Sequence, residues 1–294
     1  MTALVHARAL TKRYGDTLAL DAVDLQIDDG ECVGLLGPNG AGKTTFLSLV
    51  EGLRHPTSGS VELFGGDPRS SSSRLRLGST PQATALPESL KVGEVIDYVG
   101  AHFPRRAPRD AIIEEFGLGA FVDKQCGSLS GGQQRRVSVA LAFVGDPELV
   151  LLDEPTTGLD VDARRALWAA VRARHAAGCA IVVTSHHLEE IEQLAERVVV
   201  IDGGRVRADD TVSAVVAGVS RRRLTVAGVG AAQLSRLDPS ATVTEDADGT
   251  ATAVVADSDA LVRALVASGI AFHDLSVRGA TLEEAFLTIT KGAH

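Results

Sequence analysis

A glycine-rich loop between two apolar elements constrains this chain more than any other feature. Residues 37–44 read Gly-Pro-Asn-Gly-Ala-Gly-Lys-Thr, which fits the pattern GxxxxGK[ST]. A buried strand is expected before the loop, over Cys32–Leu36, and a helix after it, over Thr44–Val50. Glycines let successive backbone N–H groups turn toward phosphate oxygens, and the helix adds its positive N-terminal end. The sequence therefore predicts a phosphate-binding loop in an α/β fold.

Two acidic residues, Asp153 and Glu154, follow the apolar run Leu149–Leu152. Ligands of open α/β sheets lie at the carboxyl ends of strands, so both acids are expected near the phosphate loop. Lys43 is then expected to neutralise phosphate charge, while Thr44 and Asp153 hold Mg²⁺. Glu154 is expected to activate the attacking water as a general base. An ordinary pair of charges at a strand end is the alternative, but the nearby phosphate loop favours a nucleoside triphosphatase.

The remaining pattern predicts one large α/β domain followed by a smaller one. Near-continuous apolar strands alternate with helices, which is typical of a parallel sheet covered on both faces. The first forty residues read as short alternating strands, and residues 86–145 have helical spacing. From residue 219 to 294 the order β-α-β-β-α-β predicts a small ferredoxin-like α+β domain.

Composition narrows the classes of function. The formal net charge of −9 makes nucleic-acid binding, which depends on neutralising phosphates, an unexpected task, so no nucleic-acid partner is predicted. No apolar stretch is long enough to cross a bilayer, and we expect no secretory signal. The three cysteines are far apart and form no CxxC, which favours neither a metal site nor a disulfide framework.

The segment Leu129-Ser130-Gly131-Gly132-Gln133 matches the signature sequence of ATP-binding cassette (ABC) ATPases, and it precedes Asp153 as in that family. Over residues 4–215 the chain resembles these proteins in the order of its motifs. Four further elements match the family pattern: Tyr14 at the adenine-stacking position, Gln82 in the Q-loop, Thr157–Asp160 as the D-loop, and His186 in the H-loop.

The resemblance implies a P-loop NTPase fold of the ABC cassette type over residues 1–218. This fold has a parallel-sheet core, an antiparallel β subdomain and a helical insertion over about residues 86–145, and the small C-terminal α+β domain follows it. ATP and Mg²⁺ are the implied cofactors, with Gln82 joining Thr44 and Asp153 as metal ligands. The implied catalytic residues are Glu154, His186, Gln82 and Lys43. The implied nucleotide-binding residues are Tyr14, Gly37, Pro38, Asn39, Gly40, Ala41, Gly42, Lys43, Thr44, Thr45, Ser130, Gly131, Gly132 and Gln133.

The resemblance also implies two protein partners. In this family the signature helix of one copy closes on the ATP of the other, which gives a head-to-tail dimer with two nucleotides between the chains. The helical insertion implies docking to an integral membrane permease. The chain is accordingly expected at the cytoplasmic face of the membrane, attached through that permease.

The segment Asp274–Thr290 resembles the tail of stand-alone cassettes from multidrug or antibiotic-resistance exporters. Ala280 and Ala285 depart from that pattern, in which proline and valine are usual, so export is favoured only through the rest of the tail. Three alternatives stay open: the ATPase of a nutrient importer, a soluble non-transport cassette protein, and a regulatory nucleotide-binding protein. The acid Glu154 argues against the last, because a site without turnover typically lacks the base.

Overall fold

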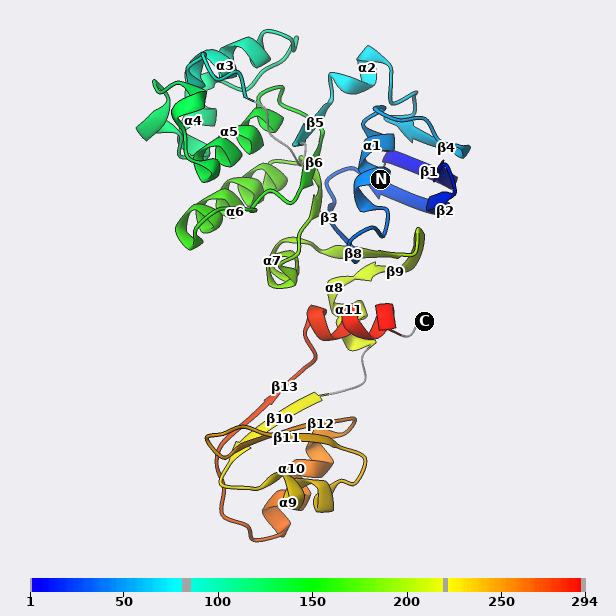
Figure 1. Cartoon of the computed structure of the whole chain (residues 1–294), viewed down its shortest axis with the longest axis vertical. Coiled ribbons are helices and arrows are strands. Elements are labelled where there is room, and N and C mark those ends of the chain that lie inside the picture. Colours follow the sequence, from blue (N-terminus) through cyan, green and yellow to red (C-terminus); the bar gives the residue numbers. More distant parts are fainter. Residues whose placement is uncertain (1, 81–85, 219–221, 292–294) are drawn as a thin grey trace. The chain divides into compact units, whose positions relative to one another are not determined.

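A computed structural model describes residues 2–80, 86–218 and 222–291. The chain divides into two compact units, residues 1–211 and 212–294, which are described separately (Figure 1). The sequence pattern places the division seven residues later, after residue 218. The difference is helix α8 (Val212–Ala217), which packs against α11 (Leu282–Lys291) and therefore belongs to the second unit.

A six-stranded sheet forms the centre of the first unit, in the order β5-β6-β7-β3-β8-β9. All neighbouring strands are parallel except the β8–β9 pair at one edge. Every residue of β3, β6 and β7 is buried, so the sheet is covered on both faces as the apolar runs predict. The strands are β3 (Cys32–Leu36), β5 (Leu77–Thr80), β6 (Leu149–Asp153), β7 (Ala180–Thr184), β8 (Arg197–Asp202) and β9 (Arg205–Thr211).

A second, antiparallel sheet holds β1 (Ala3–Tyr14), β2 (Thr17–Asp28) and β4 (Ser58–Leu63), in the order β2-β1-β4. Its apolar face shares one buried core with the parallel sheet and with α1 (Lys43–Val50). The core residue Phe46 comes from α1, which ties the helix that follows the glycine-rich loop to both sheets.

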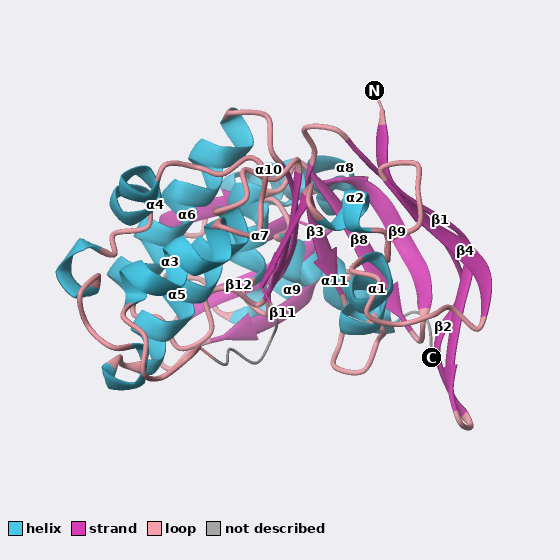
Figure 2. Cartoon of the chain, turned by 90° about the horizontal axis from the view of Figure 1, so that it is seen from above, coloured by secondary structure: helices cyan, strands magenta, loops and turns pink. Residues whose placement is uncertain are grey.

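The described residues between β5 and β6 form helices and turns, as the spacing over residues 86–145 predicts. In Figure 2, helices α3, α4 and α5 gather on one side of the first unit, away from β1 and β4. The elements are α3 (Val92–Gly100), α4 (Arg109–Glu115), η1 (Gly119–Phe121), η2 (Cys126–Ser128) and α5 (Gly131–Phe143). The other helices of this unit are α2 (Ser71–Arg74), α6 (Val161–Ala176) and α7 (Leu188–Leu194).

The second unit is a small α+β structure with its own hydrophobic core, made by residues such as Leu224, Leu234 and Leu265. Its four strands pair antiparallel in the order β11-β12-β10-β13. Besides α8 and α11, its elements in chain order are β10 (Arg222–Ala227), α9 (Ala231–Leu237), β11 (Thr242–Glu245), β12 (Thr250–Val255), α10 (Ser258–Ala267) and β13 (His273–Arg278). Across the described part of the chain, no helix has the length and apolar character needed to cross a membrane.

The three cysteines lie in poorly reactive surroundings. Cys32 and Cys126 are buried, and Cys179 is partly exposed. Burial, aided by the charge of Glu196, raises the pKa of Cys32 to about 12, and burial raises the pKa of Cys179 to about 12. Burial also raises the pKa of Cys126. Because the thiolate is the reactive form, all three thiols stay protonated near neutral pH.

We predict that the folded protein reacts slowly with a disulfide reagent such as dithionitrobenzoate at pH 8, and that all three thiols react at once in guanidinium chloride. Any slow native reaction should disappear in Cys179→Ser, since Cys179 is the cysteine with partial exposure. Rapid native labelling that survives this substitution would contradict the burial of Cys32 and Cys126.

Candidate active site

The glycine-rich loop connects β3 to α1 and can be built only with small residues at its two ends. A Cβ on Gly37 would lie 2.2 Å from the backbone oxygen of Ile201. Gly42 is the N-cap of α1 with φ of +112°, and a Cβ there would lie 2.5 Å from the backbone oxygen of Ala19. The left-handed backbone and the close contacts both require glycine. The loop is thus fixed against β8 and β2 by contacts that tolerate no side chain.

Lys43 is the first residue of α1, and its ammonium group folds back over the loop. Only 8% of the residue is exposed. Its Nζ donates hydrogen bonds to the backbone oxygens of Gly37 at 2.6 Å and Pro38 at 3.1 Å. Burial lowers the pKa of Lys43, and the negative charges of Glu154 and Asp153 act in the opposite direction. The ammonium group of Lys43 is therefore held at the phosphate loop by carbonyl oxygens and by nearby acids.

Asp153 ends strand β6 and is the point where three elements meet. The hydroxyl of Thr44 in α1 donates to Asp153 Oδ2 at 3.2 Å, and the hydroxyl of Thr184 at the end of β7 donates to Oδ1 at 2.6 Å. Thr184 Oγ1 also accepts the backbone N–H of Glu154 at 3.0 Å. Parallel pairing of β6 with β7 sets Asp153 beside Thr184. Sequence reasoning missed Thr184, although its place at the end of an apolar strand was a usable signal.

The oxygen atoms of Thr44 and Asp153 suit a hard cation. Mg²⁺ takes one or two carboxylates together with substrate phosphates and water, so it needs no cage of protein ligands. Among residues 2–80, 86–218 and 222–291, no group of three or more His, Cys, Asp or Glu side chains is arranged to hold a metal. The donor set therefore fits Mg²⁺ bound together with a nucleotide. Gln82, the third predicted ligand, lies outside the described residues.

Glu154 and His186 form a close pair beside the loop. Glu154 Oε1 lies 2.6 Å from His186 Nε2, and Glu154 has a backbone φ of +51°, which is strained for a residue with a side chain. Both residues line a cavity of about 360 Å³ together with Asn39, Lys43 and Thr44. The other residues that line this cavity are Gly40, Ala41, Gly42 and Thr45. Gly37 and Pro38 contribute backbone oxygens to Lys43 instead.

Arg135 holds the backbone of the turn that carries Asp153 and Glu154, which we call the acidic turn. Its guanidinium group is buried and donates through Nη2 to the backbone oxygens of Asp153 and, at 2.9 Å, of Glu154. Burial lowers the pKa of Arg135, while the charges of Asp153 and Glu154 oppose that shift. The side chain comes from α5, so it links the signature helix to the end of β6. Sequence reasoning missed this residue because nothing in the run that follows Gln133 marks one arginine as buried.

The signature residues stand at the start of α5. Ser130 is its N-cap, accepting the N–H of Gln133 at 3.3 Å, while Gln133 Oε1 accepts the N–H of Ser130 at 3.1 Å. Gly131 and Gly132 line a second cavity of about 480 Å³ with Thr157 and Gly158. Glu154 lines this cavity as well. Within one chain, therefore, the signature residues are not brought to the cavity of the phosphate loop.

Tyr14, the predicted adenine-stacking residue, ends strand β1 and is 42% exposed. The ammonium group of Lys12 lies 4.9 Å from the centre of its ring. The ring is therefore partly exposed and has a neighbouring cation. It does not line the cavity of the phosphate loop.

Comparisons with known proteins decide the family. A family model described as "ABC transporter" matches residues 20–157. The daunorubicin resistance ATP-binding protein DrrA3 of Streptomyces coeruleorubidus is 38% identical, in an alignment that covers 95% of this chain and 93% of the relative. The chain belongs to the ATP-binding proteins of ABC transporters. It binds and hydrolyses ATP as the nucleotide-binding subunit of a transporter.

Other proteins similar to this ABC subunit support the same family. The Nod factor export ATP-binding protein I of Cupriavidus pinatubonensis is 42% identical over 71% of this chain and 66% of the relative. Among solved structures, an ATP-binding subunit of an ABC transporter is 28% identical with a TM-score of 0.67, over 73% of this chain and 92% of the other. A cassette dimer in a post-hydrolysis state with ADP and Pi is 25% identical with a TM-score of 0.63, over 70% and 98%.

We predict that Arg135→Gln destabilises the ABC subunit by about 1–3 kcal/mol, because two backbone oxygens lose their charged donor. The ATPase rate should fall with it, since Asp153 and Glu154 lose their support. Thermal unfolding and steady-state ATPase assays measure both effects. Arg136→Gln is the matched control, because the hydrogen bond that Arg136 donates to Gly117 at 3.2 Å is exposed. Equal effects of the two substitutions would contradict the role given to Arg135.

Proposed function

We propose that this subunit energises export of a drug, antibiotic or other hydrophobic compound through a separate membrane permease. The proposal rests on the alignment with the daunorubicin resistance protein, which covers 95% of the chain. Such coverage takes in the small C-terminal unit as well as the cassette. A relative named for Nod factor export supports the same direction of transport. No comparable observation favours import or a non-transport role.

The nucleotide is bound by the loop and its helix. The proposed contacts are the backbone N–H groups of residues 37–45, of which Pro38 has none, and the ammonium group of Lys43 with the phosphates, and the ring of Tyr14 with adenine. Thr44, Asp153 and Gln82 are the proposed ligands of Mg²⁺, which when bound neutralises phosphate charge. The hydroxyl of Thr44 lies 3.2 Å from the carboxylate of Asp153, which is consistent with one shared cation.

Hydrolysis depends on Glu154 and His186 in this proposal. The carboxylate of Glu154 accepts a proton from the attacking water, and His186 orients the terminal phosphate. The 2.6 Å contact between the two side chains supports a common task. Gln82 senses the terminal phosphate and links it to the helical segment of residues 86–145.

A second copy of the chain completes each site. The helix that begins after Ser130 offers its positive N-terminal end, with Gly131, Gly132 and Gln133, to the ATP of the partner copy. The signature residues and the phosphate loop line separate cavities of one chain, which is consistent with a site shared between two chains. The proposed dimer is head-to-tail, with two-fold symmetry.

The membrane permease is the other proposed partner, and it holds the subunit at the cytoplasmic face of the membrane. The helical segment of residues 86–145 is the proposed docking surface. Residues 219–294 are proposed as an accessory domain of ferredoxin-like topology. In its exporter-like tail, Glu284 of α11 contacts Arg223 at 2.6 Å and Arg278 at 3.2 Å, so this acid fastens the last helix to β10 and β13.

We predict that Glu154→Gln retains ATP binding but lowers the ATPase rate by about 100-fold or more, because an amide cannot accept the proton of water. Binding of a fluorescent ATP analogue and release of phosphate measure the two properties. Turnover at the wild-type rate would remove Glu154 from its proposed role.

The direction and cargo are tested in inside-out vesicles from host cells that carry the permease. With daunorubicin as the probe, vesicles containing the wild-type subunit should take up the drug when ATP is added, and vesicles containing Glu154→Gln should not. Equal uptake in the two preparations would contradict the proposed export of this class of compound.

A further inference from the structure

One buried carboxylate has no part in the roles described so far. Glu190 lies in the first turn of α7, and only 8% of the residue is exposed. A buried charge persists only where donors and counter-charges surround it. Its neighbour Glu189 in the same turn is exposed. The burial of Glu190 therefore comes from the segments packed around its side chain.

Three side chains from different segments surround this carboxylate. Thr156 Oγ1 donates to Glu190 Oε2 at 3.0 Å, and Ser185 Oγ donates to the same oxygen at 3.3 Å. Arg164 Nε lies 3.1 Å from Oε1 as an ion-pair partner. The carboxylate therefore joins the loop after β6, the loop after β7 and the first turn of α6.

Two of these loops carry the reacting pair. Thr156 follows Glu154 by two residues, and Ser185 directly precedes His186. Ser185 Oγ also accepts the backbone N–H of His187 at 2.9 Å, so the backbone on both sides of His186 is tied to Glu190. The carboxylate thus connects the segment of the base to the segment of the histidine.

The reacting pair needs such external support. The His186 side chain is 52% exposed, so little packing fixes its ring. Glu154 has a left-handed backbone, a conformation that persists only where the surroundings determine it. Its N–H is held by Thr184, and the bond from Thr156 to Glu190 fixes the chain on the other side.

We propose that Glu190 is a positioning residue for ATP hydrolysis, which sets the distance between Glu154 and His186 by anchoring both of their loops. This inference rests on the proposed roles of that pair. Glu190 contacts neither the phosphate loop nor the signature residues in any described bond, so its loss should slow the chemical step and leave ATP binding intact.

The test uses Glu190→Gln, Thr156→Val and Thr156→Ser, with Glu189→Gln as the matched control. Glu190→Gln and Thr156→Val should lower kcat about 10- to 100-fold, since small misplacement of reacting groups costs rates of this order. The KM for ATP should change less than about two-fold, because binding and chemistry are separate terms. Thr156→Ser, which keeps the hydroxyl, should restore most of kcat, and Glu189→Gln should match the wild type.

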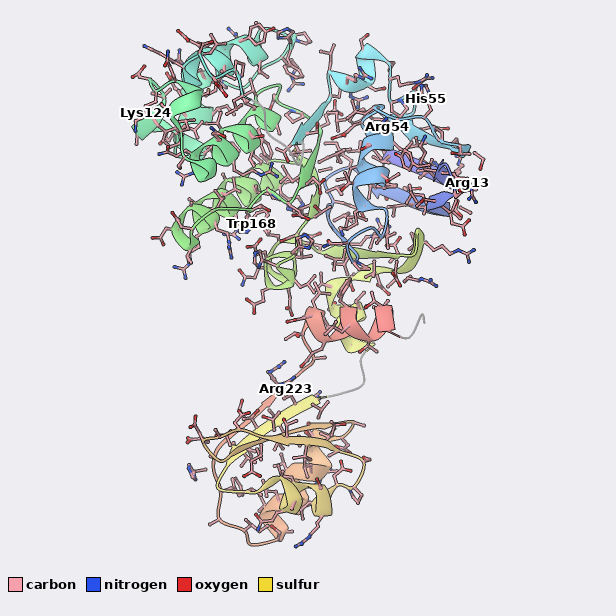
Figure 3. All side chains as sticks on the ribbon, in the orientation of Figure 1. Arg13, Arg54, His55, Lys124, Trp168 and Arg223 are labelled. Atoms are coloured by element: carbon pink, nitrogen blue, oxygen red, sulfur yellow. The ribbon has the colours of Figure 1, made fainter. Side chains whose placement is uncertain are left out.

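The fold of each variant can be checked at the same place. Trp168, the only tryptophan of the chain, is 5% exposed and lies one helical turn beyond Arg164 on α6 (Figure 3). Its fluorescence emission should stay at the wavelength of a buried indole in all four variants. If the emission wavelength shifts in one variant, that variant is left out of the comparison. The kcat of the variant at the other residue of the Thr156–Glu190 pair then tests the proposal.

Two results would overturn the proposal: wild-type kcat in folded Glu190→Gln and Thr156→Val, or equal losses in Thr156→Ser and Thr156→Val. The second would mean that packing of the threonine methyl group matters and not its hydrogen bond. Glu154→Gln measured in parallel separates the two proposals. If Glu154→Gln is inactive while the Glu190 variants turn over normally, only the positioning role fails.

Discussion

The site depends on one convergence of hydrogen bonds, in which the hydroxyls of Thr44 and Thr184 both donate to the carboxylate of Asp153. These three residues come from α1, β7 and β6, so the bonds lock the helix of the phosphate loop to the central sheet. Parallel pairing brings the carboxyl ends of the strands to one edge, where such residues can meet. From this anchor the chain positions Lys43 on one side and Glu154 on the other.

Around the anchor, the cationic side chains of Lys43 and Arg135 are held by backbone oxygens and by the nearby charges of Asp153 and Glu154. Lys43 is bonded to backbone oxygens of its own loop, and Arg135 is bonded to the backbone oxygens of the acidic turn. A buried guanidinium needs such acceptors, and the turn gains a support from the signature helix. The arrangement couples α5 mechanically to Asp153 and Glu154. A displacement of the signature helix of this ABC subunit would therefore be transmitted to the turn that carries Asp153 and Glu154.

The sequence predicted the elements that are local and missed the contacts that are distant. The phosphate loop and the apolar strands follow from short-range patterns, so the fold could be derived from them. Arg135, Thr184 and Glu190 were not found, because their partners Asp153, Glu154 and Thr156 stand 18 to 34 residues away and their burial depends on tertiary packing. The left-handed backbone of Glu154 has no local signal either, since that conformation usually belongs to glycine.

The central claim is that two copies share each ATP, the phosphate loop of one copy facing the Ser130 helix of the other. Light scattering on the Glu154→Gln subunit in Mg-ATP, which we expect to hydrolyse ATP slowly, measures this most directly, with and without Ser130→Arg. We predict a dimer for Glu154→Gln and a monomer once arginine replaces Ser130, because the bulk of the arginine side chain blocks the helix N-terminus that the phosphates need. An equally stable ATP-dependent dimer in the double variant would contradict it.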